Sequence, residues 1–254
     1  MHVVFVWMMV VCGSSLAIAG DHPSTEKLHE AWKKIEPTVR ADATFPIALE
    51  QGDFSAIANG QIAKRRIREN GPDRAMGAMW APIDRNHIWI AILDDGHDNL
   101  LSSLTETRLE NSEHGHKRLY QHLDLPWPVH NRQLVVEIQN NTDISNATEG
   151  FLWERSWDLA EPALMDKPDP SAVWIPLATG SWLLFPVENG TVVVYHVRST
   201  IGGRIPDEVV TRWAMSTLDE MMQHIVDRAG NIHTHYTGNH EILLGGDNLP
   251  IEQF

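Results

Sequence analysis

The stretch WIPLATGSWLLFPVENGTVVVYHVRSTIGGRIPDEVVTRWAMSTLDEMMQHIVDRA, residues 174–229, contains the clearest structural signals in this 254-residue chain. Residues 181–187 and 191–198 are rich in β-branched and aromatic side chains, which favour β-strands. Glu-Asn-Gly at 188–190 separates them and supplies residue types that tolerate a positive φ angle. This pattern predicts an antiparallel β-hairpin.

A long helix is predicted directly after the hairpin. Gly202 and Gly203 permit a sharp turn, and Pro206 fits a first helical turn, where no N–H is needed. Asp207 and Glu208 then suit the positive end of a helix dipole. Apolar residues at helical spacing cover roughly half of the helix circumference; they are Val209, Val210, Trp213, Ala214, Leu218, Met221, Met222, Ile225 and Ala229. So wide a stripe indicates a helix lying along the concave face of a curved antiparallel sheet.

The order of these motifs resembles a known family. GSWLLFP at 180–186, TVVVYHVRS at 191–199 and IGGRIP at 201–206, followed by the helix, are similar to the C-terminal part of START-like (StAR-related lipid transfer) domains of the helix-grip superfamily. The resemblance covers about residues 56–230. It implies an α+β helix-grip fold, with a curved antiparallel β-sheet wrapped around a long C-terminal α-helix. Such a sheet leaves a cavity beside the helix unless large side chains fill it.

The N-terminus predicts export. Residues 1–19 are almost wholly apolar and contain no Lys, Arg, Asp or Glu, and Ala17 and Ala19 are small residues of the kind that signal peptidase reads. We therefore expect a cleaved signal peptide and a periplasmic or secreted protein; an uncleaved anchor is the open alternative. Cys12 is the only cysteine and lies in this segment. The mature chain would then have no thiol for disulfides, nucleophilic catalysis or zinc binding.

Composition narrows the class of partner. The formal net charge is −14, and 43% of the residues are hydrophobic, which is enough for the core of one large domain. A negative surface repels nucleic-acid phosphates and anionic lipid headgroups. We therefore expect no nucleic-acid partner and no docking through a basic patch, whereas transient membrane contact stays open, as does the oligomeric state.

Turn and capping signals divide the rest of the chain. Residues 20–55 are expected to form an N-terminal helical and irregular extension, with a helix at 24–36 that Pro37 ends. Residues 56–230 correspond to the START-like domain, and residues 231–254 to an irregular tail. Within and just before the domain, the expected strands are 54–69, 74–80, 102–110, 116–124, 129–139 and 150–159, and a helix capped by Asp84 ends near Leu93.

One strand carries a charged residue in an aromatic row. Period-2 alternation places Trp153, Arg155 and Trp157 on the same face of strand 150–159. An isolated charge is costly to bury, so Arg155 needs an acidic partner or access to solvent. The partner is either a ligand carboxylate or phosphate held by the guanidinium fork, or an internal side chain such as Glu137.

The remaining candidate contacts come from the hairpin and the helix. The resemblance implies that the inner face of the C-terminal helix contacts ligand, and Met side chains adapt well to irregular apolar ligands. The same Met and aromatic pattern also fits a solid core. The candidate ligand-binding residues are Trp153, Arg155, Trp157, Trp182, Trp213, Thr217, Met221 and Ile225. Two glycine-containing segments, residues 94–101 and 202–203, are candidate gates for ligand exchange.

No metal or cofactor is expected. The chain has 14 histidines, including His114, His116, His233, His235 and His240, but no acidic residue stands at a recognised metalloenzyme spacing.

Three functions remain open at this stage. Some helix-grip proteins are polyketide cyclases or aromatases, and here Arg155, Asp158, Tyr195 and His196 are the polar residues that could serve such chemistry. There is no recognised nucleophile motif. We expect a non-enzymatic protein that binds or transports a lipid or other hydrophobic small molecule. The alternatives are a pocket enzyme of the cyclase or aromatase type and an interaction domain with a self-filled core.

Overall fold

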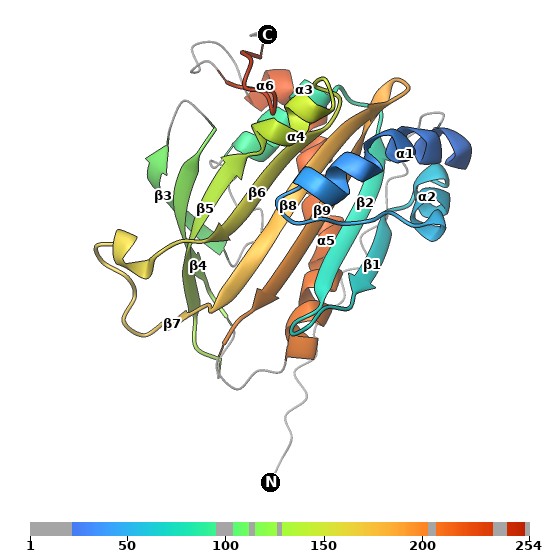
Figure 1. Ribbon diagram of the computed structural model, residues 1–254. Helices are drawn as coiled ribbons and strands as arrows, with labels where there is room; N and C mark the ends of the chain where they lie inside the picture. The colour runs from blue at the N-terminus through green and yellow to red at the C-terminus, as the bar shows by residue number, and fades with distance from the viewer. Residues whose placement is uncertain are drawn as a thin grey trace.

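The computed structural model describes residues 22–94, 104–111, 115–125, 129–202, 207–235 and 243–251. These residues form one curved sheet with helices on both faces (Figure 1). The strands are β1 (Ala63–Ile67), β2 (Arg74–Ala81), β3 (Leu104–Asn111), β4 (Lys117–Leu123), β5 (Arg132–Asn140), β6 (Trp153–Leu159), β7 (Val173–Trp174), β8 (Leu177–Val187) and β9 (Gly190–Thr200). The helices are α1 (Thr25–Asp42), α2 (Gln51–Ala58), α3 (Arg85–Leu93), α4 (Thr142–Ala147), α5 (Asp207–Gly230) and α6 (Ile232–His235), with a 3₁₀ turn η1 (Pro162–Leu164).

The sheet order among the described residues is β1-β2-β9-β8-β6-β5-β4-β3, and neighbouring strands are antiparallel. Strand β7 pairs in parallel with β5. The predicted hairpin is present as β8 and β9, whose register runs from Leu177 opposite Thr200 to Val187 opposite Gly190. Glu188 in the connecting turn has a φ of +54°. The predicted α+β helix-grip fold is confirmed.

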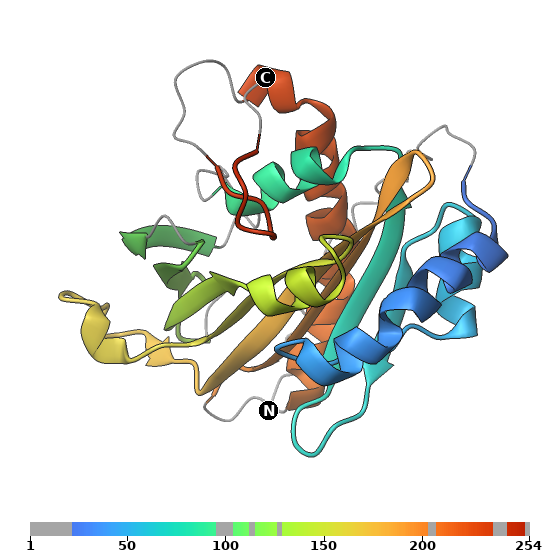
Figure 2. The ribbon, with the colours of Figure 1, turned by 45° about the horizontal axis from the view of Figure 1, so that its top comes forward.

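Helix α5 is the predicted amphipathic helix, and it crosses the concave face of the sheet (Figures 1 and 2). Its apolar stripe packs on β2 and β9, with Leu218, Met222 and Ile225 buried. The closest approach is at Gly77 of β2, because a Cβ atom there would lie 2.6 Å from the Met222 sulfur. A side chain at this position would push the helix off the sheet.

Helices α1 and α2 cover the opposite face of the sheet (Figure 2). The expectation that the first helix stops at Pro37 is wrong, since α1 continues to Asp42 with Pro37 inside it. Proline removes one helical hydrogen bond. Burial of Val39, which is 0% exposed, beyond the proline explains why the helix continues.

The strand expected at residues 54–69 is also wrong in its first half. Residues 51–58 form helix α2, and β1 begins only at Ala63. Asp53 and Glu50 form a capping box at the helix start, which is a strong local helix signal. The boundary expected at residue 56 therefore falls inside a helix.

The segment after α5 is part of the fold rather than wholly irregular. Helix α6 follows at once, and residues 243–251 turn back so that Leu244 forms a bridge with Pro250. Ile251 is buried in the same apolar cluster as α5. Helix α4 is a further element that the sequence patterns did not predict.

The predicted signal peptide at residues 1–19 lies outside the described residues. Within the described part of the chain, none of the helices combines the length and the hydropathy that crossing a bilayer demands.

Candidate functional site

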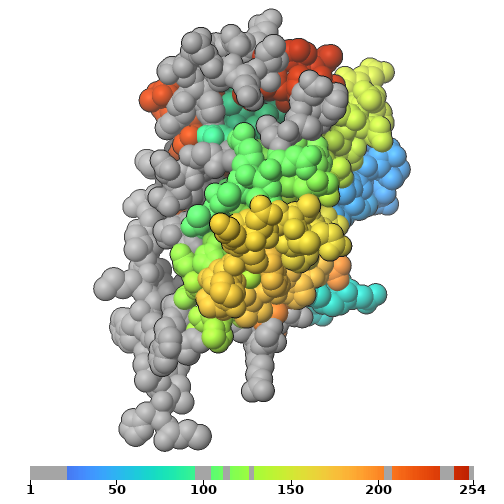
Figure 3. All heavy atoms as spheres, turned by 90° about the vertical axis from the view of Figure 1, so that its left-hand side faces the viewer, coloured from blue at the N-terminus to red at the C-terminus, as the bar shows by residue number. Residues whose placement is uncertain are grey.

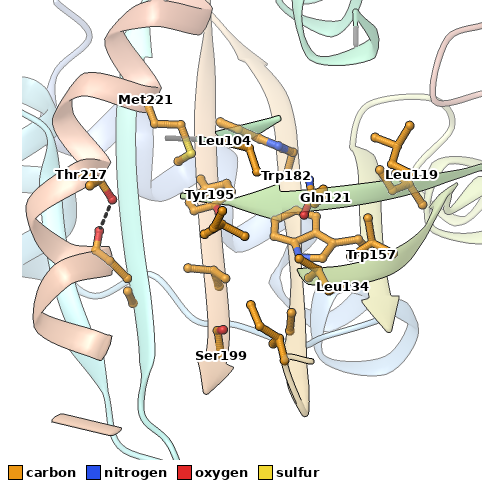
Figure 4. Close-up of a pocket in the computed structure, with 18 of the residues that line it drawn as sticks. Leu104, Leu119, Gln121, Leu134, Trp157, Trp182, Tyr195, Ser199, Thr217 and Met221 are labelled. Carbon is orange, nitrogen blue, oxygen red and sulfur yellow. Dashed lines mark hydrogen bonds between the residues drawn. The ribbon is translucent and has the colours of Figure 1, made fainter. Parts of the chain in front are cut away.

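A cavity of about 260 Å³ lies between α5 and the concave face of the sheet, from β9 and β8 to β3 (Figure 4). It exists because α5 sits tightly on β2 at Gly77, while the sheet curves away from the helix toward β4 and β5. Aliphatic side chains of these two strands form the far wall, among them Leu119, Leu134 and Val136. Figure 3 shows the outside of this half of the molecule, with β3 and β4 in green and residues 160–174 in yellow.

Seven of the eight predicted ligand-binding residues line this cavity. They come from the concave face of β6 and β8 and from α5, as the two periodicities required; they are Arg155, Trp157, Trp182, Trp213, Thr217, Met221 and Ile225. The wall residues on β4 and β5 were missed. Their alternation, with Lys117, Leu119, Gln121 and Leu123 on one face, was visible in the sequence.

Trp153 lies on the same face of β6 as these residues but outside the cavity lining. Its ring packs edge-on against Trp89 with centroids 5.2 Å apart, and the Arg85 guanidinium lies 3.7 Å from its centroid. Arg85 also donates to the carbonyl oxygens of Gly150 and Phe151. On the remaining side, a Cβ atom at Gly246 would come within 2.5 Å of the indole, so the C-terminal segment covers Trp153.

Arg155 lines the cavity and is buried, with 2% of its surface exposed. It donates to the Gly115 carbonyl at 3.1 Å and to the Asn140 side-chain oxygen. Glu137, the internal partner considered from the sequence, binds His116 and Arg118. These two bonds hold the pKa of Glu137 below its usual value.

A second buried cation stands close to Arg155. Lys117 is 5% exposed, lines the cavity, and donates to the Leu93 carbonyl at 2.7 Å. Gly115, whose carbonyl binds Arg155, precedes Lys117 by two residues in the chain. Two buried cations therefore belong to the cavity lining, which also includes the carboxylates of Asp73, Asp94 and Glu106.

Three aromatic rings form the floor of the cavity. Trp157 and Tyr195 are stacked, with centroids 5.4 Å apart and an interplanar angle of 23°. Trp182 lies opposite Tyr195 in the strand register, with centroids 4.5 Å apart. Gly180 makes this arrangement possible, because a Cβ atom there would come within 2.3 Å of the Trp157 ring. The ring of Trp157 thus lies across β8 and reaches β9.

The polar residues of the enzyme interpretation do not meet in one place. Arg155 and Tyr195 line the cavity, and burial raises the pKa of the Tyr195 hydroxyl. Asp158 is exposed. His196 follows Tyr195 in β9 and therefore points to the opposite face of the sheet.

His196 belongs to a buried network on that opposite face. Its Nδ1 lies 2.8 Å from Arg74 Nη1 and its Nε2 lies 2.8 Å from Ser181 Oγ. Because a guanidinium can only donate, Nδ1 must accept, and the ring proton is on Nε2. Burial, and then the charge of Arg74, lower the pKa of His196 to about 3.

Ser181 therefore accepts a hydrogen bond from His196 rather than donating one to it. Glu154 lies beside Ser181, and burial raises the pKa of this carboxyl group. The Glu154 carboxylate accepts from the Thr44 backbone at 3.0 Å and from Asn141 at 2.7 Å. The network ties the segment after α1 to the sheet, and its serine is not arranged as a nucleophile.

Among the described residues, no group of three or more His, Cys, Asp or Glu side chains is placed to hold a metal ion. His114 and His240 lie outside that part of the chain, and His233 packs edge-on against His87. Of the candidate gates, residues 95–101 and Gly203 also lie outside it. At the border of the first gate, Asp94 forms an ion pair with Arg228 of α5.

Neither a scan of protein-family models nor a search of curated proteins found a match. Solved structures do match. A STAR-related lipid transfer protein from Xanthomonas axonopodis has a TM-score of 0.52 and 17% identity over 66% of this chain and 92% of its own. Human STARD10 has a TM-score of 0.53 and 10% identity over 68% and 75%. Human StAR-related lipid transfer protein 5 has a TM-score of 0.50 and 10% identity over 82% and 99%. The chain thus shares the fold of these START-type structures, a curved antiparallel sheet with a long C-terminal helix.

Proposed function

We propose that this protein binds, and transports, a lipid or another hydrophobic small molecule in the cavity between α5 and the sheet. The cavity itself is the observation that carries the proposal. Its volume of about 260 Å³ is several times the ~30 Å³ that one water occupies in the liquid and lies near the lower end of ligand pockets, which start at ~300 Å³. A self-filled core would have closed this space with its Trp and Met side chains.

The lining supplies both affinity and orientation. Apolar walls from β4, β5 and α5 favour an apolar ligand, since each Å² removed from water contributes ~25 cal/mol. Arg155 and Lys117, which line the cavity beside the carbonyl groups that they bind, would orient a polar group of the ligand. Two of the matching structures are named as lipid transfer proteins, which agrees with a transport role. Binding suits this geometry better than catalysis, because His196 and Asp158 do not face the cavity.

Native mass spectrometry of the purified protein, followed by extraction and identification of bound molecules, tests the proposal. A hydrophobic molecule at near-stoichiometric level is the expected result. A clean unliganded mass that stays unchanged across a panel of lipids and sterols would contradict it. We also propose that residues 1–19 direct export and are removed; N-terminal sequencing of the natural protein would show a start near residue 20.

A pair of adjacent substitutions on α5 locates the binding site. Thr217 lines the cavity, whereas Ser216 is exposed on the other side of the helix. Thr217→Phe places a ring into the cavity and is expected to weaken ligand binding by tenfold or more, about 1.4 kcal/mol. Ser216→Phe adds the same ring outside and should leave affinity unchanged. Equal effects of the two substitutions would place the ligand elsewhere.

A further inference from the structure

Several side chains that line this largely apolar cavity carry hydrogen-bond donors. Trp157 and Trp182 on the floor, Tyr195 between them and Trp213 on α5 all line it (Figure 4 labels the first three). Within the described residues, none of these four side chains has a hydrogen-bond partner. The indole nitrogens of Trp32 and Trp153 are fully buried and have no hydrogen-bond partner. The polar atoms of the four cavity side chains differ from them, because they retain some accessible surface.

Elsewhere the same chain does satisfy indole N–H groups. Trp80 donates to the Val187 carbonyl and Trp89 donates to the Leu244 carbonyl, each at 3.0 Å. An indole nitrogen is a donor only, so each of these groups needs an acceptor when water is excluded. Three indoles that converge on one cavity without a protein acceptor are therefore available to a ligand that brings one.

The carboxylates of the cavity wall already have other partners. Asp73 binds Arg66, Asp94 binds Arg228, and Glu106 accepts from the Gln121 amide. The indole groups of the floor thus present donors toward the cavity. A ligand without acceptor atoms would leave these N–H groups unpaired, which is costly in a dry site.

The floor also selects for shape. Trp157 is stacked on Tyr195 with an interplanar angle of 23°, and the Tyr195 and Trp182 centroids are 4.5 Å apart, so that the floor is a contiguous aromatic cluster. A flat polycyclic molecule can lie against such a surface with offset stacking, whereas a flexible acyl chain gains nothing from its planarity and must also be ordered.

From the donors and the shape together, we infer that the ligand is a rigid aromatic or polycyclic molecule that carries carbonyl-type acceptor oxygens. This inference rests on the proposed function, since it names the class of ligand for the same cavity. The carbonyl oxygens accept from the indole N–H groups of the floor or of Trp213, while the rings fill the apolar space toward β4 and β5.

Two probes of the same three-ring shape test this. Fluorene is a hydrocarbon, and 9-fluorenone differs from it by one carbonyl oxygen. Isothermal titration calorimetry is expected to show about tenfold tighter binding of 9-fluorenone, because its oxygen can accept two of the free donors. A hydrophobic cavity without usable donors would prefer fluorene. Trp182→Phe keeps the ring and removes the N–H; it should weaken 9-fluorenone several-fold and leave fluorene within about twofold.

Tryptophan indole resonances in ¹H–¹⁵N spectra give an independent readout. Signals of Trp157, Trp182 or Trp213 should move downfield with 9-fluorenone but not with fluorene. Trp80 and Trp89 are internal controls, since their N–H groups already have acceptors.

Equal affinity for the two probes, tighter binding of fluorene, or binding of palmitate alone would overturn the ligand class and leave the proposed function standing. Failure of both probes, palmitate and a sterol to bind would overturn both.

Discussion

Met222 of α5 lies directly over Gly77 of β2, and a Cβ atom at Gly77 would come within 2.6 Å of the Met222 sulfur. Leu218, one turn earlier, is 3.5 Å from the same point. Gly77 faces Tyr195 in the strand register, so the close contact of helix and sheet lies beside the cavity floor. The position of α5, and with it the height of the cavity, depends on the absence of a side chain at residue 77.

Gly77→Ala is therefore expected to lower the free energy of unfolding by about 1–3 kcal/mol, the usual cost of overpacking a core. Urea denaturation measures this. Met222→Ala in the same chain makes room for the added methyl group, so the double variant should lose less than the sum of the single losses. Gly52→Ala is the matched control, because nothing lies within 4 Å of a Cβ atom there. Strict additivity would mean that the two positions are not in contact.

The helices on the outer face should be part of the same cooperative unit. Trp32 of α1 is 1% exposed and packs on Phe185 of β8 with ring centroids 6.0 Å apart. Trp32→Ala is expected to cost about 3–5 kcal/mol in urea denaturation. Trp32→Phe should cost much less, because the Trp32 N–H has no acceptor among the described residues and its loss removes no bond. Lys33→Ala, at an exposed neighbour, is the control. An unchanged stability of Trp32→Ala would show that α1 is dispensable.

The sequence predicted the fold correctly where local signals and burial favour the same structure. The turn at 188–190 and the apolar stripe of α5 each predict one structure, and alternation on β6 correctly placed Arg155 and Trp157 on one face. Prediction from the sequence failed where contacts between residues far apart in the chain determine the structure. Pro37 is a local stop signal that burial of Val39 overrides. Trp153 shares the face of Arg155, but a segment some 90 residues later in the chain covers it, and no periodicity in β6 can show that.

The buried network around His196 predicts a pH dependence. Its folded pKa of about 3 lies below the ~6.5 of an unfolded histidine. Between these values the unfolded chain binds a proton that the folded chain does not, so stability falls as the pH decreases from about 6.5. Replacing His196 with Gln should reduce the slope of unfolding free energy against pH by up to about 1.4 kcal/mol per pH unit.

Glu154 in the same network acts in the opposite sense. Its pKa is raised in the folded state, so its stabilising contribution is present at low pH and is lost as the pH rises through the folded pKa.

Because Glu154 contributes in both proteins, the effect of His196 is the difference between the wild type and His196→Gln. Urea denaturation of both proteins between pH 4.5 and 7.5, in the same buffers, measures this difference. His130→Gln, at an exposed loop position, is the control. Parallel curves for the wild type and His196→Gln would contradict the buried neutral histidine.

Gly180→Ala is expected to disturb the cavity more than the fold around it. Its Cβ atom would lie 2.3 Å from both the Trp157 ring and the His196 carbonyl oxygen. The backbone clash should cost about 1–3 kcal/mol of stability. The ring clash adds a functional effect, because Trp157 must rise off the floor into the cavity where we propose that the ligand binds. Ligand affinity should fall at least tenfold at a temperature where the variant is still folded, and near-UV circular dichroism should lose the signal of the stacked Trp157 and Tyr195 pair.

Adding Trp157→Leu to Gly180→Ala removes the lifted ring and should restore part of the affinity but not the stability. If affinity and stability instead recovered together, the loss of binding would reflect unfolding, and Trp157 would have no separate role in the cavity.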